Sequence, residues 1–136
     1  MSTSRNLSTL LFIFLISIAA GALGQDQDQD KASKREAFLL PRFCWREMMG
    51  DDVRGPEYEI PKSCGIGMNH YCVGLLKVVR ANRTFGKLDH KRGLLRAARD
   101  HTLYTLRAMK DYPQCPIRGH AERTLEQIET QLKALK

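Results

Sequence analysis

The chain has 136 residues, with 22 basic and 15 acidic side chains and a formal net charge of +7. This length predicts a single domain, and the excess of basic residues indicates anionic partners. The sequence contains no recognisable enzyme signature, which argues against a catalytic protein.

The first 24 residues, MSTSRNLSTLLFIFLISIAAGALG, predict a secretory signal peptide. Arg5 is their only charge, and the apolar run Leu10–Leu23 ends in small residues before Gly24. That run is shorter than the ~20 residues that span a bilayer as a helix. We therefore expect cleavage after Gly24, a mature protein without a transmembrane span, and a location in the periplasm or, alternatively, outside the cell.

Residues 25–37 are polar and repetitive, which predicts a flexible leader before a single α-helical domain over residues 38–136. The apolar segment FLLPRFCWREMM (38–49) follows, and Pro41 lies where the first turn of a short helix is expected. The next stretch, GDDVRGPEYEIPKSCG, holds two prolines and three glycines. It predicts an irregular connection.

Three longer helices are predicted, over Met68–Asn82, Lys91–Asp111 and Ile117–Leu135. Gly86 marks the loop between the first two, and the YPQCP segment ends the second. The apolar positions of each helix recur at helical spacing: Tyr71, Leu75, Val78 and Val79; then Leu95, Ala98, Thr102, Leu106 and Met109; then Ala121, Leu125, Ile128, Leu132 and Leu135. No run alternates as a strand would. We expect an all-α fold in which an antiparallel helical hairpin packs with a C-terminal helix and a short N-terminal helix.

Two segments of the hairpin, HYCVGLLKVVRA (70–81) and LLRAARDHTLYTLRAM (94–109), resemble exported bacterial proteins with tetratricopeptide-like helix pairs. In those proteins a His-Tyr-Cys-x-x-Leu helix start precedes a helix with Tyr-x-Leu-Arg. The resemblance covers roughly residues 64–135. It implies a helical scaffold for protein contacts and no assigned reaction or substrate. One hairpin plus one helix falls short of the three repeats that a regular array requires.

The stretch CGIGMNHYC brings two cysteines and a histidine within nine residues. A zinc site formed by Cys64, His70 and Cys72 is disfavoured, because Cys-x5-His-x-Cys matches no usual ligand spacing. A nucleophilic cysteine such as Cys72 needs a free thiol and a base, which one of the four histidines would supply (His70, His90, His101 or His120). An even number of cysteines in an exported chain favours two disulfides instead. We expect no metal and no cofactor.

Geometry favours pairing Cys64 with Cys115 and Cys72 with Cys44. A continuous helix would separate Cys64 from Cys72 by about 12 Å, beyond the ~7 Å that a disulfide bridges, although two glycines between them could relax that helix. In a hairpin that turns near Gly86, Cys64 lies close to the end where the chain leaves through YPQCP. Cys72 then lies within reach of a crossing 43–45 segment.

Ten basic residues and only two acidic ones, Asp89 and Asp100, lie between Lys77 and Lys110. Five of the ten fall near one line of the second long helix and form a predicted anion-binding surface: Arg92, Arg96, Arg99, Arg107 and Lys110. Such a line attracts anionic surfaces, and binding weakens with salt. The alternative is a solvated face. Nucleic acid is disfavoured, because no aromatic residues interleave with these arginines to stack on bases.

These patterns together predict a non-enzymatic exported helical scaffold that binds another envelope or secreted protein. The alternative is a basic module that binds anionic lipid or polysaccharide through the hairpin over residues 77–110. An enzymatic function would depend on a reduced Cys72. Asn82 begins an Asn-Arg-Thr triplet that accepts a glycan only in a eukaryotic host.

Overall fold

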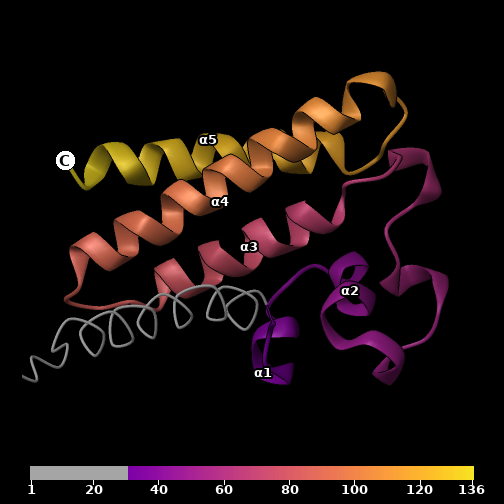
Figure 1. Cartoon of the computed structure of the whole chain (residues 1–136), viewed down its shortest axis with the longest axis horizontal. Coiled ribbons are helices and arrows are strands. Elements are labelled where there is room, and N and C mark those ends of the chain that lie inside the picture. The colour runs from indigo at the N-terminus through magenta and orange to yellow at the C-terminus, as the bar shows by residue number, and fades with distance from the viewer. Residues whose placement is uncertain (1–30) are drawn as a thin grey trace, which may run out of the picture.

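The computed structural model describes residues 31–136, which form helices and loops without any strand. Two long antiparallel helices, α3 and α4, form a hairpin, and α5 packs along α4 (Figure 1). The short helices α1 and α2 lie on the α3 side of the hairpin, with α2 toward its open end and α1 beside α3 itself (Figure 1). The α-helices are α1 (Lys34–Ala37), α2 (Trp45–Met49), α3 (Asn69–Asn82), α4 (Leu88–Ala108) and α5 (Arg118–Ala134).

Short 3₁₀ turns fill the connections. They cover Arg42–Cys44, Gly50–Asp52, Pro56–Tyr58, Lys62–Cys64 and Met109–Asp111. The all-α, disulfide-stapled fold that the sequence predicts is confirmed. The predicted signal peptide (1–24) and the first part of the predicted leader (25–30) lie outside the described residues. Over residues 31–136, no helix is both long and apolar enough to cross a membrane.

Apolar stripes hold the three long helices together in two clusters of buried side chains. Near the open end of the hairpin, Tyr71 and Leu76 of α3 pack with Met109, Ile117 and the four cysteines. Nearer the turn, Leu95 and Ile128 pack with Val78 and two alanines. Burial of these side chains is the main term that stabilises such a small helical domain.

Ordered structure begins before Phe38, because Ser33 and Glu36 form a capping box for α1. The Ser33 hydroxyl accepts a hydrogen bond from the Glu36 amide, and a Glu36 carboxylate oxygen accepts one from the Ser33 amide at 2.9 Å. Ala37 is fully buried. The last residues of the predicted flexible leader are therefore helical, and the sequence SKRE carries the pattern that identifies them.

Candidate functional site

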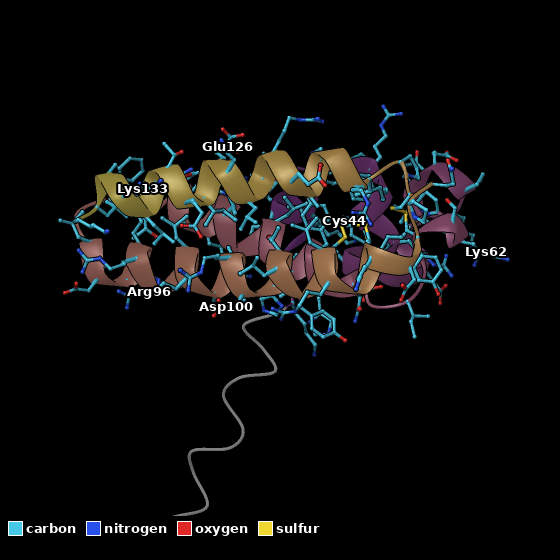
Figure 2. The ribbon with its side chains drawn as sticks, turned by 90° about the horizontal axis from the view of Figure 1, so that it is seen from above. Cys44, Lys62, Arg96, Asp100, Glu126 and Lys133 are labelled. Carbon is cyan, nitrogen blue, oxygen red and sulfur yellow. A yellow bond between two sulfur atoms is a disulfide. The ribbon has the colours of Figure 1, made fainter. Side chains whose placement is uncertain are left out.

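A basic groove lies between α4 and α5. Its volume is about 230 Å³, and most of its lining side chains are cationic. Figure 2 shows the two helices side by side, with Arg96 on α4 and Lys133 on α5. Glu129 has the only acidic side chain among the described residues that line the groove, which we call the α4–α5 groove: Arg92, Arg96, Arg99, Glu129, Leu132, Lys133 and Lys136.

Two of the three α4 arginines in this groove also bind within the fold. Arg92 forms an ion pair with Asp89 at 2.9 Å and donates a second hydrogen bond to the backbone carbonyl of Leu135. The Arg99 Nε lies 3.5 Å from the Asp100 carboxylate, which gives a weak, half-exposed ion pair. Arg96 is exposed. The groove thus combines arginines that are held in place with one that extends into solvent.

The structure separates the five residues that were predicted to form one anion-binding line. Arg92, Arg96 and Arg99 share the α4–α5 groove, whereas Arg107 borders a different cleft with Asp100 and Tyr104. Lys110 lies in the 3₁₀ turn that follows α4 and is exposed. Arg107 lies eight residues beyond Arg99, which places it about 12 Å further along the axis of α4 and past the end of the groove.

His70 lies against α4. Its Nδ1 is 3.3 Å from Nδ1 of His101, and its ring centroid is 4.3 Å from that of Tyr104. One residue along a helix turns the side chain by about 100°, so Tyr71 faces α5 while its neighbour faces α4.

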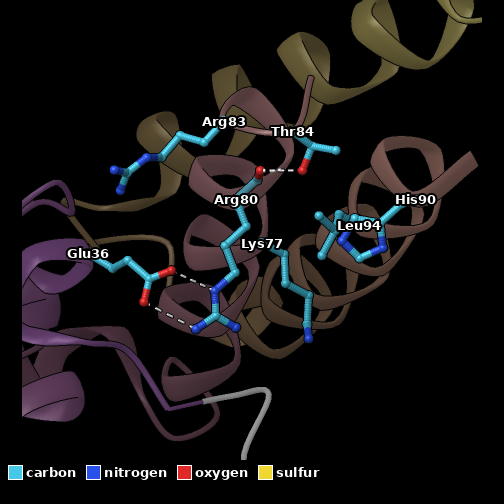
Figure 3. A pocket seen from close by; sticks show the side chains of 7 residues that line it. All are labelled: Glu36, Lys77, Arg80, Arg83, Thr84, His90 and Leu94. Carbon is cyan, nitrogen blue, oxygen red and sulfur yellow. Dashed lines mark hydrogen bonds and ion pairs between the residues drawn. The ribbon is translucent and has the colours of Figure 1, made fainter. Parts of the chain in front are cut away.

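A second basic cleft, of about 370 Å³, lies on the other side of the hairpin (Figure 3). Arg80 lies at its centre and pairs with Glu36 at 2.8 Å. The hydrogen bond from Arg80 holds the pKa of Glu36 at about 2, well below its usual 4.5. Arg80 also donates to the backbone carbonyl of Lys31 at 2.8 Å, so this arginine attaches the N-terminal segment to α3.

A buried polar cluster links α3 to α5. The Tyr71 hydroxyl lies 2.8 Å from the Thr124 hydroxyl and in hydrogen-bond contact with Nδ1 of His120. Thr124 donates its only proton to the backbone carbonyl of His120, so its oxygen accepts from Tyr71, and Tyr71 in turn accepts from the imidazole N–H. Burial raises the pKa of Tyr71 to about 12 and lowers the pKa of His120 below its ordinary value.

All four cysteines are in disulfides, with the predicted pairing. Cys44 bonds Cys72 across a Cα–Cα distance of 5.5 Å, and Cys64 bonds Cys115 across 4.5 Å. Bonded sulfurs are neither thiolate ligands nor nucleophiles. The zinc site and the nucleophilic cysteine that the CGIGMNHYC stretch suggested therefore both lack the thiols that they require.

Sequence reasoning missed two parts of this arrangement. The first part is the pair of lysines in the α4–α5 groove, Lys133 and Lys136, which follow Glu129 at helical spacing. Each of these residues comes one position after an apolar residue of the stripe in the third predicted helix. This offset places them on the face of the helix beside its buried face, and the sequence could have shown it. The second part is the cluster of Tyr71, His120 and Thr124. His120 and Thr124 lie four residues apart, so they share one face of α5.

Comparison with protein-family models, with curated proteins and with solved structures finds no match to this chain.

Proposed function

We propose that the protein is a non-catalytic exported binding module that holds an acidic segment of another protein in the α4–α5 groove. The observation that carries this proposal is the convergence of arginines from α4 and lysines from the end of α5 on one groove in which Glu129 is the only acidic side chain among the described lining residues. Arginine side chains match carboxylates in geometry and pair with them through two hydrogen bonds.

The spacing of the cations suits an extended chain. Arg92 and Arg96 are one helical turn apart, which separates them by about 6 Å along α4. In an extended peptide, every second side chain points the same way at intervals of about 6.7 Å. Alternate acidic side chains of a bound segment would therefore meet successive arginines. Leu132 provides an apolar contact for the side chains between them.

The shape of the groove favours a polypeptide segment over the other anions that the sequence suggested. A flat bilayer cannot enter a recess between two helices. A polysaccharide offers few apolar groups for Leu132, while an acidic protein segment offers both kinds of contact. The resemblance to tetratricopeptide-like scaffolds favours the same class of partner, because it implies protein contacts.

Two buried disulfides are consistent with an exported protein, because disulfides persist mainly outside the cytoplasm. We place the protein in the periplasm, with the extracellular space as the alternative. The intact mass of the exported protein tests the first step. We expect a chain that begins at Gln25, and a mass that includes residues 1–24 would contradict export by a cleaved signal peptide.

Binding of a fluorescent peptide of alternating Glu and Leu tests the groove. We expect the affinity to fall steeply with salt and to fall about tenfold or more in an Arg96→Glu, Lys133→Glu variant. The matched control is Lys62→Glu, Lys110→Glu, which changes the net charge by the same amount. Both lysines are exposed, Lys62 lies at the far end of the molecule (Figure 2), and Lys110 follows α4 at that end. Equal losses in both variants would show that only net charge matters, which would contradict the proposal.

Folding of the groove variants is checked separately with Arg92, Arg96 and Arg99 all changed to Glu. We expect the far-UV circular dichroism to remain nearly unchanged, because the buried positions Leu95 and Ala98 lie on another face of α4. Collapse of the helical signal would mean that these arginines serve the fold and not a partner.

A further inference from the structure

The turn between α3 and α4, which we call the hairpin tip, carries two large apolar side chains in solvent. Phe85 is 86% exposed and Leu88 is 59% exposed, although both residues lie within one short turn. Gly86 at the apex adopts a positive φ of 71°, which glycine allows without strain. The turn therefore holds both side chains at the convex end of the molecule.

Cations surround these two side chains. Arg83 and Lys87 are exposed within the turn itself, and Lys91 follows on the first turns of α4. The bond from Arg92 to the Leu135 carbonyl brings the C-terminal end of α5, with Lys136, to this same end of the molecule. Asp89 is the acidic residue of the tip, and its carboxylate already pairs with Arg92.

We propose that the hairpin tip docks on an anionic lipid bilayer, with Phe85 and Leu88 inserted among the headgroups and the surrounding cations against lipid phosphates. An aromatic and an aliphatic side chain flanked by Lys and Arg have the composition of segments that lie in a membrane interface. Each cation near an anionic bilayer strengthens binding, by a factor of about five.

A folded protein partner fits the tip less well. Stable protein interfaces bury about 800 Å² on each partner, and two side chains on a convex turn fall far short of that area. A bilayer needs no complementary pocket, since the lipids rearrange around an inserted side chain. The tip and the α4–α5 groove share Lys136, but Phe85, Leu88 and the other exposed cations of the tip do not line the groove, so docking on lipid would leave the rest of the groove accessible to its own partner.

Tryptophan fluorescence reports directly on insertion. The chain has one tryptophan, Trp45, which is half-buried and stacks on Tyr58 with the ring centroids 5.4 Å apart. In a Phe85→Trp variant, we expect vesicles of phosphatidylglycerol and phosphatidylcholine to cause a blue shift, and brominated lipids to quench the new signal. Vesicles of phosphatidylcholine alone should produce neither effect.

The matched control is Ile66→Trp. Ile66 is 88% exposed and precedes Gly67, which lies near Tyr104 and Ala108 at the other end of α4, about 30 Å from the tip. We expect no lipid-dependent change in this variant. A blue shift at both positions, or at neither, would overturn the proposal. Because the test compares two positions in the same chain, any lipid affinity of residues 1–24 affects both variants equally.

Vesicle co-sedimentation supplies the energetic test. We expect the partition coefficient to fall about tenfold or more in a Phe85→Ser, Leu88→Ser variant and to change little in Ile66→Ser. Reversal of Lys87 and Lys91 to Glu should weaken binding by at least the ~25-fold that loss of two cations implies. Unchanged partitioning in the Phe85→Ser, Leu88→Ser variant would refute insertion. Acidic-peptide binding should survive the Phe85→Ser, Leu88→Ser substitution, which leaves the charge unchanged, so this proposal and the groove proposal can fail separately.

Discussion

At the scale of single residues, Arg80 is the side chain through which the N-terminal helix depends on the hairpin. Its guanidinium binds the Glu36 carboxylate and the Lys31 carbonyl, and Glu36 at the same time completes the capping box of α1. The ion pair is only partly exposed, with 25% and 20% of the two side-chain surfaces accessible. Glu36 therefore stabilises the protein only while it is ionised.

Replacement of Glu36 by Gln should lower the free energy of unfolding by about 1–2 kcal/mol at pH 7, less than the pKa shift alone implies because water screens the pair. The folded pKa of Glu36 is about 2 and lies below its ordinary 4.5. Its contribution is therefore complete above about pH 5 and is lost as the pH falls towards 2. Urea denaturation of both proteins from pH 7 to pH 2 measures this difference.

The control for this pH dependence is Glu47→Gln, which changes an exposed carboxylate of α2. We expect its effect on stability to be within about 0.5 kcal/mol at pH 7. A gap between wild type and Glu36→Gln that stays constant down to pH 2 would show that the carboxylate does not act through its charge.

Removal of the Tyr71 hydroxyl in Tyr71→Phe should lower the free energy of unfolding by about 1–2 kcal/mol. The reason is that Thr124 and His120 lose the hydroxyl with which both form hydrogen bonds in the buried cluster. Thermal and urea unfolding measure the loss. Tyr104→Phe is the matched control, because Tyr104 is 45% exposed and water can replace its contacts. Equal stabilities of the two variants would contradict a structural role for the cluster.

At the scale of helices, the sequence predicted the elements well but not how they face one another. The stripe from Tyr71 to Val79 located α3 to within one residue, and the spacing of Arg92, Arg96 and Arg99 placed them on one side of α4. A stripe gives the buried face of each helix, but it does not give the rotation at which two faces meet. The lysines of α5 in the groove therefore could not be assigned to it.

The start of α4 was also predicted too late. The helix begins at Leu88 and not at Lys91, directly after the turn at Gly86. No side-chain cap marks this start, since the ammonium side chain of Lys87 at the N-cap position has no acceptor for the first amides of the helix. Sequence patterns identify helix ends mainly through such caps. The tip therefore could not be recognised as a tight turn with exposed Phe85 and Leu88.

The close approach of α3 and α4 depends on Gly74. A β-carbon added there would lie 3.1 Å from the β-carbon of His101 and 3.3 Å from the backbone carbonyl of Ala98. We expect Gly74→Ala to lower the free energy of unfolding by about 1–2 kcal/mol, because this strain outweighs the gain in helix propensity. Urea denaturation measures the change.

Gly93→Ala in the neighbouring helix, α4, should change the free energy of unfolding in the opposite direction. A β-carbon at Gly93 of α4 meets nothing within 4 Å, so only propensity changes. We expect this variant to be more stable than wild type by up to about 1 kcal/mol. Stabilisation by Gly74→Ala as well would show that the two helices can separate without cost.

At the scale of the whole molecule, both disulfides lie at the open end of the hairpin and the basic tip lies at the other. Cys44–Cys72 attaches the N-terminal segment to α3, and Cys64–Cys115 closes the open end where α4 leads into α5. The four half-cystines are buried or nearly so. The end of the molecule that carries the disulfides is thus cross-linked, while the tip is held by non-covalent contacts alone.

Replacement of Cys64 and Cys115 by Ala should lower the free energy of unfolding by about 4 kcal/mol in the loop-entropy estimate, since the bond joins residues 51 positions apart. Replacement of Cys44 and Cys72, which are 28 positions apart, should cost slightly less, about 3.5 kcal/mol. Denaturant titrations give both values. Non-reducing peptide maps provide the control, and a Cys64–Cys72 or Cys44–Cys115 peptide would contradict the pairing.

The Cys64–Cys115 bond also decides what happens when a protease cuts the exposed tip. Cleavage after Arg83 or Lys87 divides the backbone between α3 and α4, yet Cys64 stays in the first piece and Cys115 in the second. The cut molecule thus remains one covalent unit. In non-reducing gel electrophoresis it migrates like the intact chain, and it separates into two fragments only when a reductant is added. Proteolysis would remove the continuous turn and create two new chain ends there, while the rest of the domain stays assembled.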